Sequence, residues 1–176
     1  RLESHLVASR DDKFIIRSYS PVFTIGGGEV IETLIEDKWK VVKDKIKTLY
    51  EKSKPEQLIL LVQQDIANPM TPEQLQIRFG LSNEKICKWV ESEEELFWLN
   101  HNKSKWLLTQ HQWSILKERV KKYLSIYHKS NPLHIGAQKE EIRQYLQCGV
   151  SLLEAILLLM LEDNQINRKE KYWLSP

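Results

Sequence analysis

The sequence predicts a mostly α-helical fold with small β-strands, of the α+β class, and three observations lead to this prediction. Short β-branched or aromatic runs fill residues 1–36, an amphipathic helical pattern begins at Asp37, and a pattern of helices followed by paired strands then occurs twice. The chain has 176 residues, 41% of them hydrophobic, and six tryptophans. This is enough for one domain or for two small ones with packed cores.

The first 36 residues read as short strands separated by turn residues, with strands expected at residues 5–9, 13–20, 21–25 and 29–34. Three successive glycines, Gly26, Gly27 and Gly28, lie between the last two. Such triplets mark a bulge, a tight turn or a close approach of two backbones. A phosphate-binding loop requires a lysine after its last glycine, where this chain has Glu29. We therefore expect the three glycines to form a structural turn.

Residues 37–54 predict a basic linker helix. Seven lysines against two acidic residues lie between Lys38 and Lys54, and apolar residues recur among them at helical spacing. The expected apolar face consists of Trp39, Val42, Ile46, Leu49 and Tyr50. A helix of this kind packs one face on a core and exposes its lysines to solvent.

Residues 55–109 contain the first copy of the repeated pattern. Pro55 favours a helix start, Thr71 and Gln74 have the spacing of a capping box, and Gly80 ends the helix that they begin. A third helix follows, and the apolar runs LFWL and KWLL flank the polar tip NHNKS as the strands of a hairpin. Three helices and a two-stranded wing are the arrangement of a winged-helix domain.

The same order recurs in residues 110–176. A long amphipathic helix, two further helices and two strands follow one another, and KWLL at 105–108 corresponds to YWLS at 172–175, a period of about 67 residues (172 − 105). We therefore expect two winged-helix domains in tandem. The third helix of the second domain, SLLEAILLLMLED, is apolar nearly all round. It should be buried, and the first winged helix is one surface that would cover it.

No pattern in the sequence points to catalysis or to a metal site. The five histidines are scattered, and Cys87 and Cys148 have no cysteine or histidine near them at metal-ligand spacing. Two separated cysteines fit the reduced, buried thiols of a cytoplasmic protein. The longest apolar run, Leu152–Leu161, is shorter than the roughly 20 residues that span a bilayer. We expect no enzymatic activity, no cofactor, no metal and no membrane partner for this stretch of chain.

Nucleic-acid binding is the function that the repeated fold favours, because a winged helix presents its third helix and its wing to a duplex or hairpin. The exposed candidates of the first domain are Lys85 and Lys88 on the helix and Asn102, Lys103 and Lys105 on the wing. Those of the second are the wing residues Arg168, Lys169 and Lys171. The alternative for each is an ordinary solvated side chain, and the acidic stretch Glu91–Glu95 would repel phosphate.

Two segments, residues 12–31 around the glycine triplet and residues 127–146 in the second winged helix, carry motifs. These motifs resemble those of the bacterial selenocysteine-specific translation elongation factors, the SelB family. DKFIIRSYSPVFTIGGGEVI is similar to the FxLRxxSPxxTIGGGxVL segment that ends the third domain of that family, a barrel like that of elongation factor Tu. YHKSNPLHIGAQKEEIRQYL is similar to the yHxxxPlrxGlxxeeLR passage of the family's second winged helix. The first match rests on Phe14, Ile16, Arg17, Ser20, Pro21, Thr24, Ile25, Gly26, Gly27, Gly28 and Val30. The second rests on Tyr127, His128, Pro132, Leu133, Gly136, Glu140, Glu141 and Arg143.

The resemblance implies a domain order, in which residues 1–36 are the terminal strands of a translation-factor β-barrel, 37–54 a linker helix, and 55–109 and 110–176 winged helices. It implies a fragment, with Arg1 in place of an initiator methionine. The parent would be a GTP-dependent factor, with GTP and Mg bound upstream, that delivers selenocysteinyl-tRNA to the ribosome at recoded UGA codons. The fragment would be a monomer or weak dimer that links the tRNA-binding body to the tip that reads an mRNA hairpin.

The chain also departs from the family pattern. No GTPase motif is present, and LHIG at 133–136 replaces the more basic LRPG, with His134 where an arginine is common. Two other functions stay open. A DNA-binding transcription regulator with tandem winged helices predicts affinity for duplex DNA and leaves the TIGGG segment unexplained. A protein-interaction module predicts no affinity for nucleic acid at moderate salt.

Overall fold

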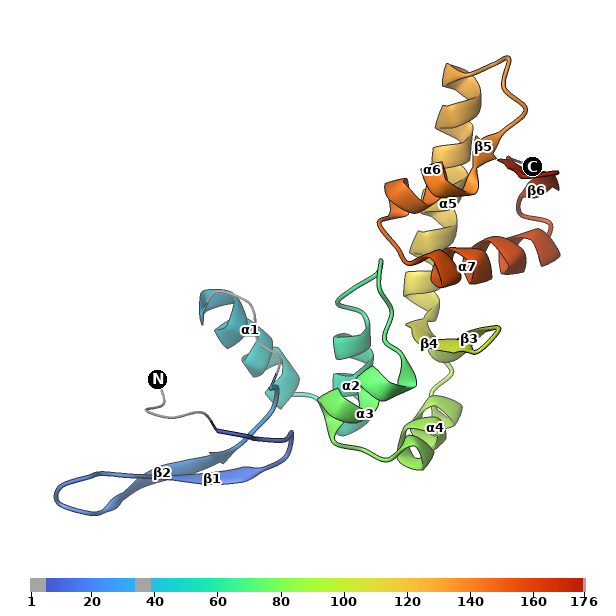
Figure 1. Ribbon diagram of the computed structural model, residues 1–176. Coiled ribbons are helices and arrows are strands. Elements are labelled where there is room, and N and C mark those ends of the chain that lie inside the picture. Colours follow the sequence, from blue (N-terminus) through green and yellow to red (C-terminus); the bar gives the residue numbers. More distant parts are fainter. Residues whose placement is uncertain (1–5, 34–38, 176) are drawn as a thin grey trace. The chain divides into compact units, whose positions relative to one another are not determined.

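The computed structural model describes residues 6–33 and 39–175 of the chain (Figure 1). The chain forms two compact units, one of residues 1–60 and 72–89 and the other of residues 61–71 and 90–176. The first unit combines helices with one small antiparallel sheet, and the second combines helices with two. This confirms the predicted α+β class.

The first unit begins with a β-hairpin. Strand β1 (Lys13–Arg17) pairs antiparallel with β2 (Thr24–Glu29), and the register shifts between Ile16 and Arg17, so that Ile25 is the extra residue of a bulge. The predicted strands at 5–9 and 29–34 were wrong for residues 6–9 and 30–33, and residues 5 and 34 lie outside the described residues. The ladder between β1 and β2 ends at Lys13 and Glu29, and Val30 still bonds to the backbones of Asp11 and Asp12. Before that point the chain forms a turn, closed by a bond of 3.2 Å from Asp12 N to Ser9 O, instead of a strand.

The three glycines do not form the predicted turn, because Gly26, Gly27 and Gly28 lie inside β2. The turn is the loop at residues 18–23, closed by a hydrogen bond of 2.9 Å from Ser18 N to Phe23 O. A Cβ on Gly27 would lie 2.8 Å from the carbonyl oxygen of Phe14, and one on Gly28 would lie 2.7 Å from the Phe14 ring. The close approach of β1 to β2 therefore requires glycine at positions 27 and 28, which is one of the roles that the triplet predicts.

Four helices follow the hairpin: α1 (Trp39–Tyr50), α2 (Lys54–Val62), α3 (Pro72–Phe79) and α4 (Asn83–Ser92). The first confirms a helix within the predicted residues 37–54, and its Val42 and Leu49 are buried. Tyr50, predicted on the same face, is 80% exposed, because the helix ends there and the chain turns away with a bond from Lys52 N to Leu49 O. The side chain of Trp39 lies outside the described residues.

Helix α2 begins with a cap that the side chain of Glu56 provides. The Glu56 carboxylate accepts hydrogen bonds of 2.9 Å from Ser53 N and 2.8 Å from Ser53 Oγ, and one of 3.2 Å from Lys52 Nζ. These bonds, led by that from the Ser53 backbone, lower the pKa of Glu56 from its usual 4.5 to about 2. Pro55 lies in the first turn, where its missing N–H costs nothing.

Two arginines, the buried Arg10 and the half-buried Arg78, attach the residues next to the hairpin to the helices of the first unit. Arg10 donates to Ile31 O at 2.7 Å and to the side-chain oxygen of Gln57, and burial lowers its pKa. Arg78 of α3 donates to the buried Glu32 carboxylate at 2.7 Å. Such paired, desolvated guanidinium groups hold a segment in one place, because breaking the pair leaves a buried charge alone.

The second unit holds the remaining elements, whose bounds follow the predicted repeat. They are β3 (Leu96–His101), β4 (Ser104–Thr109), α5 (Gln110–Ser130), β5 (Ala137–Gln138), α6 (Lys139–Leu146), α7 (Val150–Glu162), β6 (Asn167–Lys169) and β7 (Tyr172–Leu174). Strands β3 and β4 form a hairpin, and the second wing has the strand order β5-β7-β6. Its third strand, β5, was not predicted, since two residues carry no periodicity.

One hydrophobic core joins the β3–β4 hairpin to the second winged helix. Leu99 and Trp106 of the hairpin belong to the same buried cluster as residues of α5, α6 and α7. Six residues of α7 are buried, namely Leu152, Leu153, Ala155, Ile156, Leu157 and Met160. The predicted burial of this helix is therefore confirmed, and the wing of the first repeat shares its core.

Among the described residues no single helix is long and apolar enough to cross a membrane. Only α6 and α7 taken together pass that test, and they are bent by 109°. The apolar side chains of α7 already lie in the core of the second unit.

Candidate nucleic-acid interface

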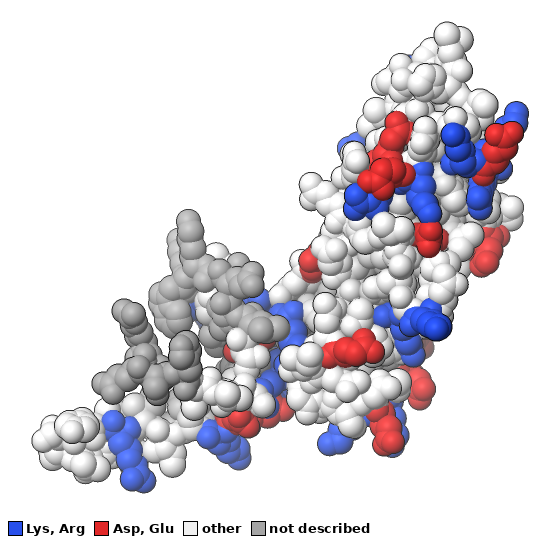
Figure 2. Space-filling view, in the orientation of Figure 1, with Lys and Arg blue, Asp and Glu red and all other residues white. Residues whose placement is uncertain are grey.

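The predicted contact residues of the first winged helix are divided between the two units, with Lys85 and Lys88 in the first and Asn102, Lys103 and Lys105 in the second. Lys85 and Lys88 are exposed on α4, and Lys103 is exposed in the β3–β4 turn. The ammonium of Lys105 lies 4.2 Å from the centre of the Trp98 ring, and Asn102 Nδ2 lies 3.0 Å from His101 Nε2. Figure 2 shows basic and acidic side chains interspersed on the visible face of the molecule. None of these five residues lines the cavity at the second wing.

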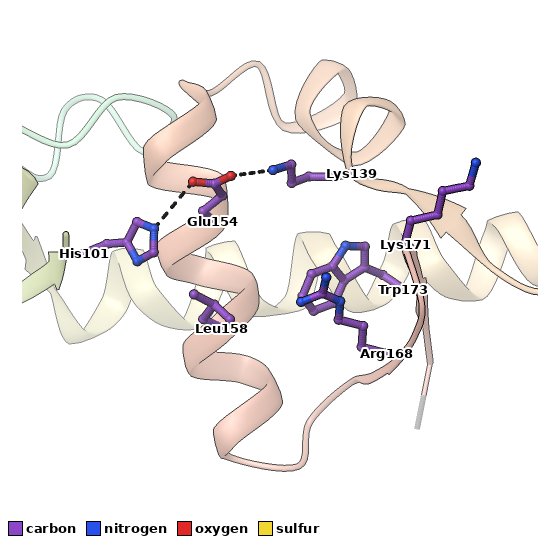
Figure 3. Close-up of a pocket in the computed structure, with 7 residues that line it drawn as sticks. All are labelled: His101, Lys139, Glu154, Leu158, Arg168, Lys171 and Trp173. Carbon is purple, nitrogen blue, oxygen red and sulfur yellow. Dashed lines mark hydrogen bonds and ion pairs between the residues drawn. The ribbon is translucent and has the colours of Figure 1, made fainter.

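That cavity, which we call the wing cleft, has a volume of about 340 Å³ (Figure 3). It lies in the second unit, between the end of β3, the start of α6, helix α7 and the β6–β7 wing. The lining residues are His101, Lys139, Glu154, Leu158, Arg168, Lys171 and Trp173. Two of the three predicted wing residues, Arg168 and Lys171, are among them, while Lys169 is exposed on β6 outside the lining.

The guanidinium of Arg168 is held in place on one side of the wing cleft. Its carbon lies 5.2 Å from the centre of the Trp173 ring, and Arg168 Nε donates a hydrogen bond of 2.9 Å to Glu170 O. The stacked arrangement is visible in Figure 3. Because the ring and the carbonyl fix the guanidinium plane, its terminal amino groups are already oriented for a phosphate or carboxylate. No ion pair joins Arg168 to a carboxylate within the described residues.

Glu154 provides the single carboxylate of the lining. It forms an ion pair with Lys139, and its Oε2 lies 3.5 Å from His101 Nε2 (Figure 3). The hydrogen bond from Lys139 is the main cause that lowers the pKa of Glu154, and His101 adds to it. The carboxylate is therefore charged at neutral pH. The lining therefore contains one acidic side chain and three basic ones, those of Lys139, Arg168 and Lys171.

Sequence reasoning missed His101, Lys139 and Glu154 as neighbours of the second wing. Lys139 reaches the cleft because β5 pairs with β7 through Ala137–Trp173 and Gln138–Tyr172. His101 reaches it because the β3–β4 hairpin packs in the core of α7. Both contacts join residues far apart in the sequence, and no local pattern signals them. The one usable hint was Glu154, a charged residue in the middle of a largely apolar helix.

The fold and the cleft place the chain in the class of proteins with tandem winged helices, here with a basic cavity at one wing. Residues 121–174 match the family model described as elongation factor SelB, winged helix, specifically its second winged-helix domain. This part of the chain is therefore similar to the second winged-helix domain of SelB.

A solved structure extends the likeness beyond that domain. The crystal structure of a bacterial selenocysteine-specific elongation factor, EF-Sec, superposes on 99% of the chain with a TM-score of 0.63 and 19% sequence identity. The chain spans 27% of the length of that protein. A comparison with curated protein sequences finds no match. The predicted resemblance to selenocysteine-specific elongation factors is confirmed by the family model and the shared fold.

Proposed function

We propose that the chain is part of a selenocysteine-specific elongation factor and serves as its RNA-associated arm. The arm links a tRNA-binding body to a tip that reads an mRNA hairpin, and residues 37–54, 55–109 and 110–176 are its linker helix and two winged helices. Selenocysteinyl-tRNA, the mRNA hairpin and the ribosome are partners of the whole factor. GTP and Mg belong to a domain outside this chain, which itself catalyses no reaction.

The observation that carries the proposal is the oriented guanidinium of Arg168 in a cationic cleft, on a domain similar to the second winged helix of SelB. A fixed arginine beside Lys171 and Lys139 suits the phosphates of a nucleic-acid backbone. Binding of this kind is electrostatic, so the affinity falls steeply as the salt concentration rises.

The exposed hairpin β1–β2 supports the same family role. Phe14, Ile15 and Ile25 are 43%, 67% and 62% exposed, although strands usually bury one face. Strands that complete a larger β-barrel have this composition, because the rest of the barrel covers their apolar side chains. The alternative function, a DNA-binding regulator, leaves this hairpin unexplained.

The proposal is tested by fluorescence anisotropy with a labelled single-stranded RNA of about 12 nucleotides, at several salt concentrations. The variant Arg168→Glu/Lys171→Glu should lose at least about tenfold in affinity, since it reverses two charges of the cleft. The matched control is Lys121→Glu/Lys122→Glu, which reverses two exposed charges on α5 in the same unit and should change the affinity far less. No binding at low salt, or an equal loss in both variants, contradicts the proposal.

Two further probes separate the other functions. Tighter binding of a DNA duplex than of RNA would favour a transcription regulator. The quadruple variant Lys85→Glu/Lys88→Glu/Lys103→Glu/Lys105→Glu tests the first winged helix. Unchanged RNA affinity in that variant means that these lysines are only solvated side chains, and that the wing cleft alone carries the binding.

A further inference from the structure

A carboxylate in the middle of a cationic cleft works against simple phosphate binding. Glu154 lines the wing cleft together with Arg168 and Lys171, and one third of its side chain is exposed. A phosphate that enters the cleft is attracted by the three cations and repelled by this one anion. If phosphate were the whole ligand, a neutral residue at position 154 would bind it better.

Glu154 still has room to accept a hydrogen bond. A carboxylate offers about four lone-pair positions, and Lys139 and His101 each occupy one, on different oxygens. The side chain projects from α7 into the cleft, where Figure 3 shows it between these two partners. An additional donor from a ligand can therefore reach the carboxylate while both ion pairs stay in place.

A nucleic-acid strand supplies such a donor only when it is RNA. The ribose 2′-hydroxyl lies within one nucleotide of each phosphate, so a backbone held by Arg168 brings a hydroxyl among the other lining residues. A hydroxyl that donates to an ionised carboxylate forms one of the stronger hydrogen bonds available to proteins. DNA lacks this hydroxyl and meets the same negative charge without the compensating bond.

We propose that Glu154 makes the wing cleft select RNA over DNA by accepting a hydrogen bond from a ribose 2′-hydroxyl. The inference rests on the proposed function, which places an RNA backbone in this cleft. In this role Glu154 determines specificity, and Arg168 and Lys171 supply the affinity common to both nucleic acids.

The test compares three labelled single strands of one sequence: RNA, 2′-fluoro RNA and DNA. The fluoro strand keeps the sugar conformation of RNA and lacks the hydroxyl donor. The wild-type chain should bind RNA about tenfold or more tightly than either of the others, as expected for one charge-assisted hydrogen bond. The variant Glu154→Leu should bind all three strands with similar affinity, and its affinity for DNA should rise because the repulsion is gone.

The matched control is Glu162→Leu, which removes the same charge from an exposed position on α7 and should keep the wild-type preference. If Glu154→Leu does not fold, Glu154→Gln serves instead and should reduce the preference. A tenfold preference that survives either substitution of Glu154 overturns the inference. Equal binding of RNA and DNA by the wild-type chain also overturns the inference. If Arg168→Glu/Lys171→Glu then still abolishes that binding, the proposed function stands. Binding of none of the three strands at low salt overturns both.

Discussion

The side-chain amide of Gln112 donates a hydrogen bond of 2.8 Å to the backbone carbonyl of Val62, 50 residues earlier in the chain. The same amide lies 3.2 Å from Asp65 O, and Gln112 Oε1 accepts a bond of 2.9 Å from Thr109 N. Gln112 is fully buried. One side chain thus joins the end of α2, the end of β4 and the start of α5 within the second unit.

Replacing Gln112 by leucine should therefore destabilise the second unit. Leucine fills a similar volume and leaves Val62 O and Thr109 N without this buried partner, which costs about 1–3 kcal/mol. Urea denaturation followed by circular dichroism measures the change in the free energy of unfolding. Gln110→Leu, on the exposed first residue of α5, is the control and should cost less than about 0.5 kcal/mol. Equal stability of the Gln112 variant and the control would show that the amide is not a structural tie.

The glycines of β2 should differ sharply in their tolerance to alanine. Gly27→Ala places a methyl group 2.8 Å from the backbone oxygen of Phe14, and a backbone atom cannot move aside without separating the strands. Gly26→Ala meets nothing within 4 Å and is the matched control. Hydrogen exchange of the β1 and β2 amides should be about tenfold or more faster in the Gly27 variant than in the control. Equal protection in both variants would contradict the close-approach role.

The helices and wings could be predicted because their signals are local. Apolar residues at helical spacing, Gly80 at φ 61° after α3 and the paired runs of β3 and β4 each lie within a few residues of one another. The role of the glycine triplet could not be predicted, because a turn and a close approach of two strands both favour glycine. The wing cleft could not be predicted either, since the two-residue strand β5 and the β3–β4 hairpin bring its lining residues together. Local propensity carries no information on such pairings.

The cap at the start of α2 should make the stability of the first unit depend on pH. The folded-state pKa of Glu56 lies near 2, below its usual 4.5, so the cap stabilises fully above pH 4.5 and is lost as the pH falls toward 2. Wild type should be more stable than Glu56→Gln at pH 7, and the difference should close between pH 4.5 and 2. Denaturation midpoints at a series of pH values measure this. Glu51→Gln, at an exposed glutamate nearby, should follow the wild-type curve. A constant difference between wild type and Glu56→Gln across that range would contradict the cap.

The geometry of Arg168, beyond its charge, should matter for binding. Arg168→Lys keeps the positive charge and loses both the planar stack on Trp173 and the bond from Nε to Glu170 O. A lysine is a flexible point charge that must be ordered when a phosphate binds, and it offers no paired donors. We expect about tenfold weaker RNA binding in fluorescence anisotropy, with a similar slope of affinity against salt, because the number of charges is unchanged. Lys171→Arg is the control, since it also conserves charge and should leave the affinity near the wild-type value. If Arg168→Lys binds RNA as tightly as that control, the cleft acts only through its net charge and the orientation of the guanidinium has no part in recognition.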